Sequence, residues 1–291
     1  MTTPRQATPR QVTPLAAVLL APNPSPMTLE GTNTWLLRAP GEEGCVVVDP
    51  GPDDGDHLGA VAAAGRIEVI LLTHGHPDHS AGAATLHELT GAPVRALDPS
   101  HRLGSEGLGA GDVLDLVGIE LRVLPTPGHS SDSLSFLLAG DERPASPGPA
   151  TAPSALAGPS GLTGPSGPAV LTGDTILGRG TTVVAHPDGR LGDYLDSLRL
   201  LRDLGETTVL PGHGPELPAA GAAAERYLAH REARLAQVRQ ALVDAGTTAA
   251  EADAAAVVRR VYADTDRALW PAAEMSVRAQ LDYLRERPDM P

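Results

Sequence analysis

The amino-acid sequence predicts a layered α/β domain followed by a small helical module. Between residues 15 and 210, short apolar runs bounded by Gly and Pro alternate with segments of helical spacing, and this alternation is typical of layered α/β folds. After residue 217 the apolar residues recur only at helical spacing. The chain has 291 residues, 41% of them hydrophobic, so it is long enough to bury a sizeable core.

The expected strands and helices follow from these two kinds of spacing. Apolar runs predict strands over residues 15–21, 34–38, 45–48, 67–72, 93–97, 113–117, 119–124, 134–138, 169–172 and 209–210. Apolar positions three or four residues apart predict helices over residues 58–62, 83–89, 191–201, 228–242, 248–262 and 277–284.

Composition divides the chain into three parts. Residues 1–14 consist mostly of Thr, Pro, Gln and Arg without periodicity, and we expect a disordered arm there. Residues 15–216 form the α/β domain, which contains a flexible insertion of Pro, Ala, Gly, Ser and Thr at residues 141–168. Residues 217–291 form the C-terminal helical module.

Charge and cysteine content limit the partners and the location of the protein. The net charge is −14, so we expect no strong binding to duplex nucleic acid. The only cysteine, Cys45, lies in an apolar run and cannot form an intramolecular disulfide. No apolar run approaches the length of a membrane span, and residues 15–21 are too short for a convincing signal peptide. We therefore expect a cytoplasmic protein without a membrane partner, and the oligomeric state is left open.

The most distinctive segment is residues 74–79, His-Gly-His-Pro-Asp-His, directly after an apolar run. Side chains alternate along a strand, so His74 and His76 lie on the same side where the strand ends. Asp78 and His79 fall at the start of the next segment and can point at a second ion. The hexad therefore predicts a pair of metal ions.

Three later loops carry one ligand-type residue each. His129, Asp174 and His213 each follow a glycine at the end of a predicted strand. The glycine lets the backbone turn tightly, so that the next side chain faces a shared cavity. Other histidines match no ligand loop, and we expect them to be structural or surface residues: His57, His87, His101, His186 and His230.

Together these residues provide the ligands that two divalent ions require. The first ion is assigned to His74, His76 and His129. The second ion is assigned to Asp78, His79 and His213, with Asp174 as the bridge between them. Imidazole and carboxylate ligands without thiolate favour Zn²⁺, with Fe or Mn as alternatives. A bridging water would become hydroxide near neutral pH and serve as the nucleophile.

These motifs resemble the metallo-beta-lactamase superfamily from about residue 15 onward. The resemblance implies an αββα metallo-beta-lactamase sandwich with the metals at one edge, and residues 15–216 would be its catalytic domain. Its metal ligands match the residues named above one by one. It also implies that Asp49, in Val48-Asp49-Pro50-Gly51, supports the metal loop from behind the ligands.

Residues 23–34, 173–178 and 227–232 resemble the lactamase-beta-like protein 2 group within this superfamily. That group carries a C-terminal winged-helix-like module, and its animal members are single-strand RNA endonucleases, so the resemblance implies a candidate nuclease activity. The chain ends soon after the third C-terminal helix, so we expect the β-hairpin wing to be truncated or missing. Asn33 is expected from its position to border the substrate site.

The leading hypothesis is a binuclear metal-dependent hydrolase in which a bridging hydroxide attacks an ester-type bond, with Asp78 and Asp174 as catalytic residues. Single-stranded RNA is the substrate that the group resemblance implies. A thioester or other small acyl compound, as in glyoxalase II of the wider superfamily, fits the acidic composition better.

Two other functions stay open. One is a mononuclear iron oxygenase of the persulfide-oxidising type, and the other is a non-catalytic metal-binding protein. On the C-terminal side, Arg226, Arg231, Arg234 and Arg239 form either a local basic face or a solvated helix surface.

Overall fold

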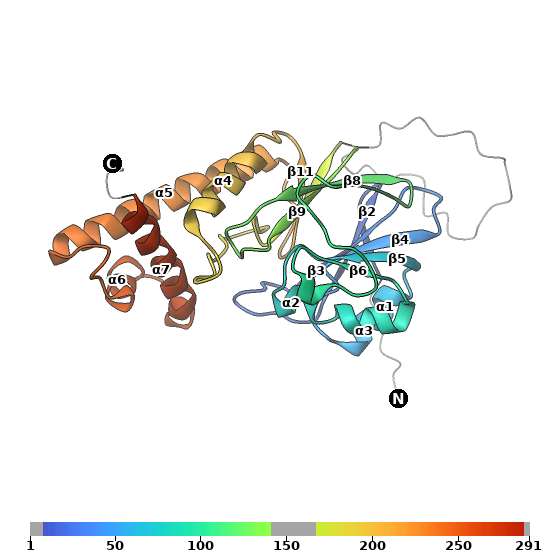
Figure 1. Ribbon diagram of the computed structural model, residues 1–291, viewed down its shortest axis with the longest axis horizontal. Helices are drawn as coiled ribbons and strands as arrows, with labels where there is room; N and C mark the ends of the chain where they lie inside the picture. The colour runs from blue at the N-terminus through green and yellow to red at the C-terminus, as the bar shows by residue number, and fades with distance from the viewer. Residues whose placement is uncertain (1–7, 141–166, 288–291) are drawn as a thin grey trace.

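The computed structural model describes residues 8–140 and 167–287. Two sheets pack face to face, and helices cover their outer surfaces, which gives the αββα arrangement of Figure 1. The first sheet has six strands in chain order, antiparallel from β1 to β4 and parallel from β4 to β6. They are β1 Arg10–Thr13, β2 Ala16–Leu20, β3 Asn33–Leu37, β4 Gly44–Val48, β5 Arg66–Leu71 and β6 Val94–Arg95.

The second sheet has five strands in the order β11-β10-β9-β8-β7. All neighbours are antiparallel except β10 and β11, which are parallel. They are β7 Val113–Leu116, β8 Ile119–Pro125, β9 Leu134–Leu138, β10 Ala169–Gly173 and β11 Thr208–Pro211. The pairing of β9 with β10 holds Leu138 opposite Ala169, although residues 139–168 separate the two in sequence.

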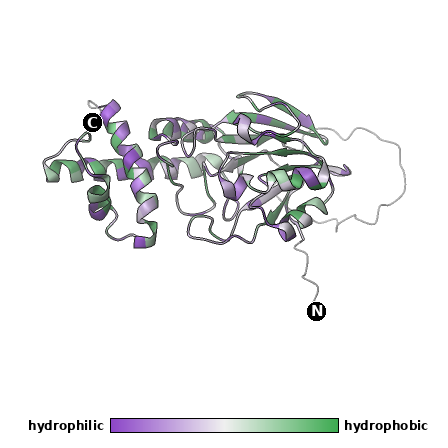
Figure 2. Cartoon of the chain, turned by 60° about the horizontal axis from the view of Figure 1, so that its bottom comes forward, coloured by the Kyte–Doolittle hydropathy of each residue, from purple (hydrophilic) through white to green (hydrophobic). Residues whose placement is uncertain are grey.

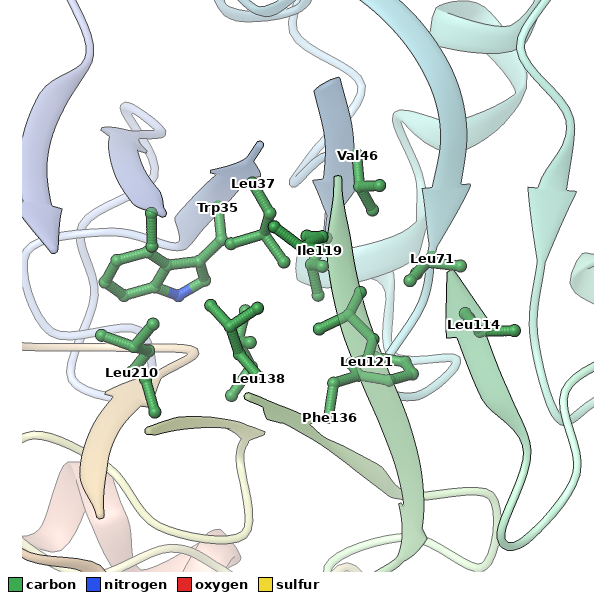
Figure 3. Packing of buried hydrophobic residues seen from close by; sticks show 14 of the residues in the cluster. Trp35, Leu37, Val46, Leu71, Leu114, Ile119, Leu121, Phe136, Leu138 and Leu210 are labelled. Carbon is green, nitrogen blue, oxygen red and sulfur yellow. The ribbon is translucent and has the colours of Figure 1, made fainter. Parts of the chain in front are cut away.

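The main core lies between the two sheets. Figure 3 shows Trp35, Leu37 and Val46 of the first sheet facing Leu121 and Phe136 of the second. These side chains are at most 2% exposed, and burying each contributes roughly 1.5–3 kcal/mol. A register slip of one residue would turn the whole set to the opposite face of its sheet and out of this core.

The outer helices bury the opposite faces of the sheets. Leu58 of α1 and Leu86 of α3 pack on the first sheet, and Leu198 of α4 packs on the second. Figure 2 shows predominantly hydrophobic strands, whereas the helices carry both hydrophilic and hydrophobic residues. The helices of this domain are α1 Gly55–Ala62, α2 Pro77–Ser80, α3 Ala83–Thr90, the 3₁₀ turn η1 Pro99–His101 and α4 Leu191–Arg202.

The helix α5, Ala220–Ala245, joins the sandwich to the C-terminal module (Figure 1). Its first half packs against α4 through Ala224 and Tyr227, and its second half packs against the last two helices through Val238 and Leu242. Those helices are α6 Ala254–Val261 and α7 Trp270–Glu286, with the 3₁₀ turn η2 Arg267–Leu269 between them. The described part of this module, up to residue 287, contains helices and no strand.

Three expectations need correction. Residues 10–13 form strand β1 instead of a disordered arm, because Arg10 pairs with Val18 of β2 and its guanidinium binds Glu216. The strand expected over residues 93–97 is limited to β6, because Val94 also exchanges backbone hydrogen bonds with Leu103. The helix expected over residues 248–262 begins only at residue 254, where the Asp253 side chain caps α6.

The insertion expected at residues 141–168 falls, up to residue 166, outside the described residues. Among the described residues, no helix combines the length and the apolar character needed to cross a bilayer.

Candidate metal centre

The predicted ligand residues meet at one edge of the sandwich, where four strands end. The hexad follows β5 of the first sheet, whereas His129, Asp174 and His213 follow β8, β10 and β11 of the second. The number of residues between these loops does not determine their distance in space. The loops meet because the two sheets pack face to face. The structure brings together every residue that was predicted to bind metal.

His74, His76 and His129 form the first group of donors. His76 Nδ1 lies 3.1 Å from His74 Nε2 and 2.9 Å from His129 Nε2. Nitrogens bound to one tetrahedral zinc ion at about 2.0–2.1 Å would lie roughly 3.3 Å apart. The three imidazoles therefore fit one ion after a shift of a few tenths of an ångström.

Asp78, His79 and His213 form the second group. His213 Nε2 lies 3.1 Å from His79 Nε2 and 3.1 Å from Asp78 Oδ2. Asp174 stands between the groups, with Oδ1 3.3 Å from the Nε2 atoms of both His79 and His213, and Oδ2 3.7 Å from His129 Nε2. Despite these two nitrogens, Asp174 Oδ1 is buried and no donor of the described residues meets it with hydrogen-bond geometry, so a cation between the two groups would supply the partner that it lacks.

Hydrogen bonds behind the ligands fix which imidazole nitrogen faces the centre. In four of the histidines Nδ1 contacts an oxygen outside the centre, which leaves Nε2 to bind metal. These contacts are His74 to Thr73 Oγ1 at 3.0 Å, His79 to Asp49 Oδ2 at 2.9 Å, His129 to the Val183 carbonyl at 2.7 Å and His213 to the Gly31 carbonyl at 3.1 Å. His76 instead presents Nδ1.

Asp49 lies where the resemblance predicts it, behind the hexad. Its carboxylate is 1% exposed and accepts hydrogen bonds from Thr73 N at 2.8 Å, Thr73 Oγ1 at 2.7 Å and His79 Nδ1 at 2.9 Å. Its φ is 55°, a left-handed conformation that Asp tolerates better than most side chains. Asp49 thus holds both the start of the hexad loop and one of its imidazoles.

Burial and the neighbouring charges give the imidazoles of the centre different protonation states. Burial lowers the pKa of His74 well below its ordinary value and also lowers the pKa of His129, so both imidazoles are neutral near pH 7. Burial also acts to lower the pKa of His79, but the carboxylates of Asp174 and Asp49 outweigh it and raise that pKa well above its ordinary value. A cation that binds His79 must therefore displace a proton.

Gly212 is needed for the ligand loops to approach so closely. A Cβ at this position would lie 2.7 Å from His79 Cε1 and 2.9 Å from Asp174 Oδ1, so a larger side chain would push these loops apart. A Cβ on Gly75, between the first two histidines, would lie 2.5 Å from His101 Nε2, so a larger side chain there would displace the His101 ring.

Asn33 holds the His213 loop. Its Nδ2 donates to the carbonyls of Pro211 at 3.0 Å and Gly214 at 2.8 Å, so both amide hydrogens are used by the fold. Contact between Asn33 and a substrate stays a prediction.

Two tyrosines that sequence analysis did not select hold the Asp174 loop. Tyr194 of α4 donates to the Thr175 carbonyl at 2.8 Å, and the hydroxyl of Tyr227 in α5 bonds both the N–H and the carbonyl of Leu177. Their helical spacing indicates burial but gives no sign of these hydrogen bonds.

A cavity of about 320 Å³ opens beside the metal-binding residues. It reaches from His129 and Asp174 to the C-terminal module, and its walls include His230, Arg231 and Arg234 of α5. Residues 26–29, residues 177–183 and the segment around η2 and α7 supply the rest. This volume is typical of sites for small molecules. Sequence analysis did not identify His230 as a cavity residue.

An αββα sandwich with these two His/Asp groups at one edge defines a metal-dependent hydrolase. The family model described as "Metallo-beta-lactamase superfamily" matches residues 27–213, and the chain belongs to this superfamily. A second model, "Beta-lactamase associated winged helix domain", matches residues 254–287. The resemblance and the fold class predicted from the sequence are thereby confirmed.

Curated relatives cover most of the chain. A protein named "Beta-lactamase-like protein 2 homolog" from Caenorhabditis elegans is 29% identical over 279 residues, which is 91% of this chain and 82% of that protein. One named "Atrochrysone carboxyl ACP thioesterase" from Aspergillus fumigatus is 32% identical over 234 residues, which is 77% of this chain and 64% of that protein.

Solved structures share the fold. A metallo-beta-lactamase family protein from Thermus thermophilus matches with a TM-score of 0.69 and 24% identity, covering 94% of both chains. A beta-lactamase domain protein from Burkholderia ambifaria matches with a TM-score of 0.72 and 22% identity, covering 99% of this chain and 91% of that one.

Proposed function

We propose that this protein uses two zinc ions to hydrolyse a carboxylic thioester or ester of a small acyl compound. The observation that carries the proposal is the pair of donor groups linked by Asp174, directly beside a cavity of small-molecule size. When bound, such a pair of ions supplies a hydroxide nucleophile at neutral pH and polarises the oxygen of the electrophile.

The two carboxylates of the centre are ionised at neutral pH. Burial acts to raise the pKa of Asp174, but His213 and His79 outweigh it and hold that pKa well below its ordinary value. Burial acts in the same direction on Asp78, where His213 and His79 again prevail and lower the pKa. Both carboxylates can accept hydrogen bonds from water and orient it. Asp78, whose pKa is lowered less far than that of Asp174, is the better proton acceptor of the two.

The proposed reaction consumes one water molecule. Its oxygen forms a bond to the acyl carbon, and the bond from that carbon to the sulfur or oxygen of the leaving group breaks. One water hydrogen stays with the product acid and the other is transferred to the leaving thiol or alcohol. Asp78, whose side chain is 29% exposed, lies at the open side of the centre and is suited to pass this proton on.

The thioester assignment is supported by the relative named as an acyl-carrier-protein thioesterase. The net charge of −14 also weakens attraction to a polyanion. Single-stranded RNA is a second candidate, because Arg231 and Arg234 stand in the same cavity as Asp174 and guanidinium groups bind phosphate well.

The test compares substrates and variants side by side. Zinc-loaded protein is incubated with a panel of acyl thioesters and with a fluorescent single-stranded RNA, and metal content per chain is measured. We expect two zinc ions, metal-dependent thioester cleavage and intact RNA. Asp174→Ala should abolish cleavage, whereas Asp203→Ala, which removes an exposed carboxylate after α4, should not. Cleavage of RNA alone would favour the second candidate, and one iron per chain would favour an oxygenase.

A further inference from the structure

The cavity beside the metal centre contains positive charge that the proposed hydrolysis does not use. Among the described residues that line it, Asp174 is the only acidic one, whereas Arg179, Arg231 and Arg234 are basic. Arg179 is neutralised by Glu30, whose carboxylate lies 2.6 Å from its Nη1. In the described part of the chain, Arg231 and Arg234 form no ion pair with a carboxylate. The inner wall of the cavity is therefore cationic, although the chain as a whole is acidic.

Arg231 is held in place without a counter-ion. Its side chain is 4% exposed, donates to the Thr182 carbonyl and lies over the ring of Tyr194, with Cζ 5.1 Å from the ring centroid. Among the described residues, its Nε has no hydrogen-bond partner. A buried guanidinium without an opposite charge is costly. An anion in the cavity would supply that charge.

Arg234 stands three residues further along α5, on the same helix face as Arg231. It donates to the Val261 carbonyl at 3.1 Å and to Gln237 Oε1 at 3.0 Å, and its Cζ lies 4.6 Å from the centroid of the Tyr262 ring. These contacts fix the guanidinium and leave its charge uncompensated. Two arginines ordered on one face match the planar, two-oxygen geometry of a carboxylate or phosphate.

The cavity also has apolar walls. Leu29, Leu177 and Leu269 line it together with His129, Asp174 and the α5 cations. A molecule that fills the space therefore meets Asp174, leucine side chains and the arginines of α5.

We propose that Arg231 and Arg234 form an anion subsite, so that the small-molecule substrate carries a carboxylate or phosphate remote from the bond that is cleaved. This inference rests on the proposed function for the nature of the scissile bond, but the subsite itself can be tested without hydrolysis. The C-terminal module then contributes to substrate selection, because Tyr262 and Leu269 complete the walls.

The kinetic test uses matched acetyl thioesters of a neutral thiol, N-acetylcysteamine, and of two anionic thiols, 3-mercaptopropionate and 2-mercaptoethyl phosphate. We expect at least one anionic thioester to have a kcat/KM about tenfold or more above the neutral one. Arg234→Gln should reduce this ratio at least tenfold, and Arg234→Lys should restore part of it. Arg226→Gln is the matched control, because Arg226 is an exposed arginine of the same helix whose guanidinium, within the described part of the chain, bonds only the Ala222 carbonyl.

Binding to the metal-free protein separates failure of the subsite from failure of the proposed function. Calorimetry with glutarate and with inorganic phosphate should show binding that weakens at least tenfold in Arg234→Gln and persists in Arg226→Gln. That result supports the subsite even if no thioester is hydrolysed, and the preferred anion distinguishes carboxylate from phosphate. Equal kcat/KM for neutral and anionic thioesters, with anion binding unchanged in Arg234→Gln, would overturn the inference. Loss of RNA cleavage alone in Arg234→Gln would also overturn it, because the arginines would then bind a nucleic acid.

Discussion

Replacing Asp49 by Asn should weaken the second metal group without disturbing the fold. Asn has the same shape and also tolerates the left-handed backbone at this position. One side-chain oxygen can still accept from Thr73 N, but an amide nitrogen then faces His79 Nδ1, where Oδ2 now accepts. His79 can avoid this clash of donors by carrying its proton on Nε2, the nitrogen that faces His213. Its metal-binding lone pair is then lost.

The size of the effect follows from the bond that is lost. A hydrogen bond to a charged group contributes about 1.5–3 kcal/mol, and loss of such a partner behind a metal ligand typically lowers affinity by about 10–100-fold. We therefore expect one of the two zinc ions to bind about 10–100-fold more weakly in Asp49→Asn. Competition with a chromophoric chelator measures both ions separately.

Asp53→Asn is the control, because Asp53 is an exposed residue near α1, and Thr85 is the only described residue that donates a hydrogen bond to its carboxylate. It should leave both zinc affinities unchanged. If Asp49→Asn also bound both ions as tightly as the unmodified protein, the orientation of His79 by Asp49 would not govern metal binding.

Two further predictions concern stability. Tyr227→Phe leaves the N–H and the carbonyl of Leu177 without their partner, so urea denaturation should show a loss of about 1–3 kcal/mol; an unchanged midpoint would mean that water replaces the hydroxyl. Burial lowers the pKa of His57 below its ordinary value, although the charge of Asp54 acts to raise it. At this site the unfolded chain therefore binds a proton more readily than the folded protein does. The free energy of unfolding should consequently fall as the pH drops below about 6.5. In His57→Gln this decline between pH 7 and pH 5 should be shallower, and identical urea profiles for the two proteins would contradict the assignment.

Sequence patterns predicted the strands well wherever the two sheets bury them. Val46 and Leu71 are examples, because their strands are buried on both faces and therefore read as nearly continuous apolar runs. Arg10–Thr13 escaped prediction because an edge strand with exposed polar side chains has no such pattern. Its place depends on backbone pairing with β2, which any sequence can provide.

The candidate metal ligands that the structure brings together could be selected from the sequence because coordination chemistry restricts residue types. Histidine and aspartate seldom occur together at such a fixed short spacing unless they bind a metal ion. The cavity was not predictable, because it depends on distant segments meeting. Arg231 shows the difficulty, since an arginine on a helix is ordinarily exposed and its burial depends on Thr182 and Tyr194. The four arginines of α5 differ in burial: Arg231 is buried, Arg226 is exposed, and Arg234 and Arg239 are half-buried.

All the predicted metal ligands lie at or before His213, whereas the far wall of the cavity comes from α5 and the module beyond it. The two parts are not independent, because Tyr227 in the first half of α5 also holds the Asp174 loop. A substitution that shifts α5 would therefore act on the cavity wall and on the metal centre at once.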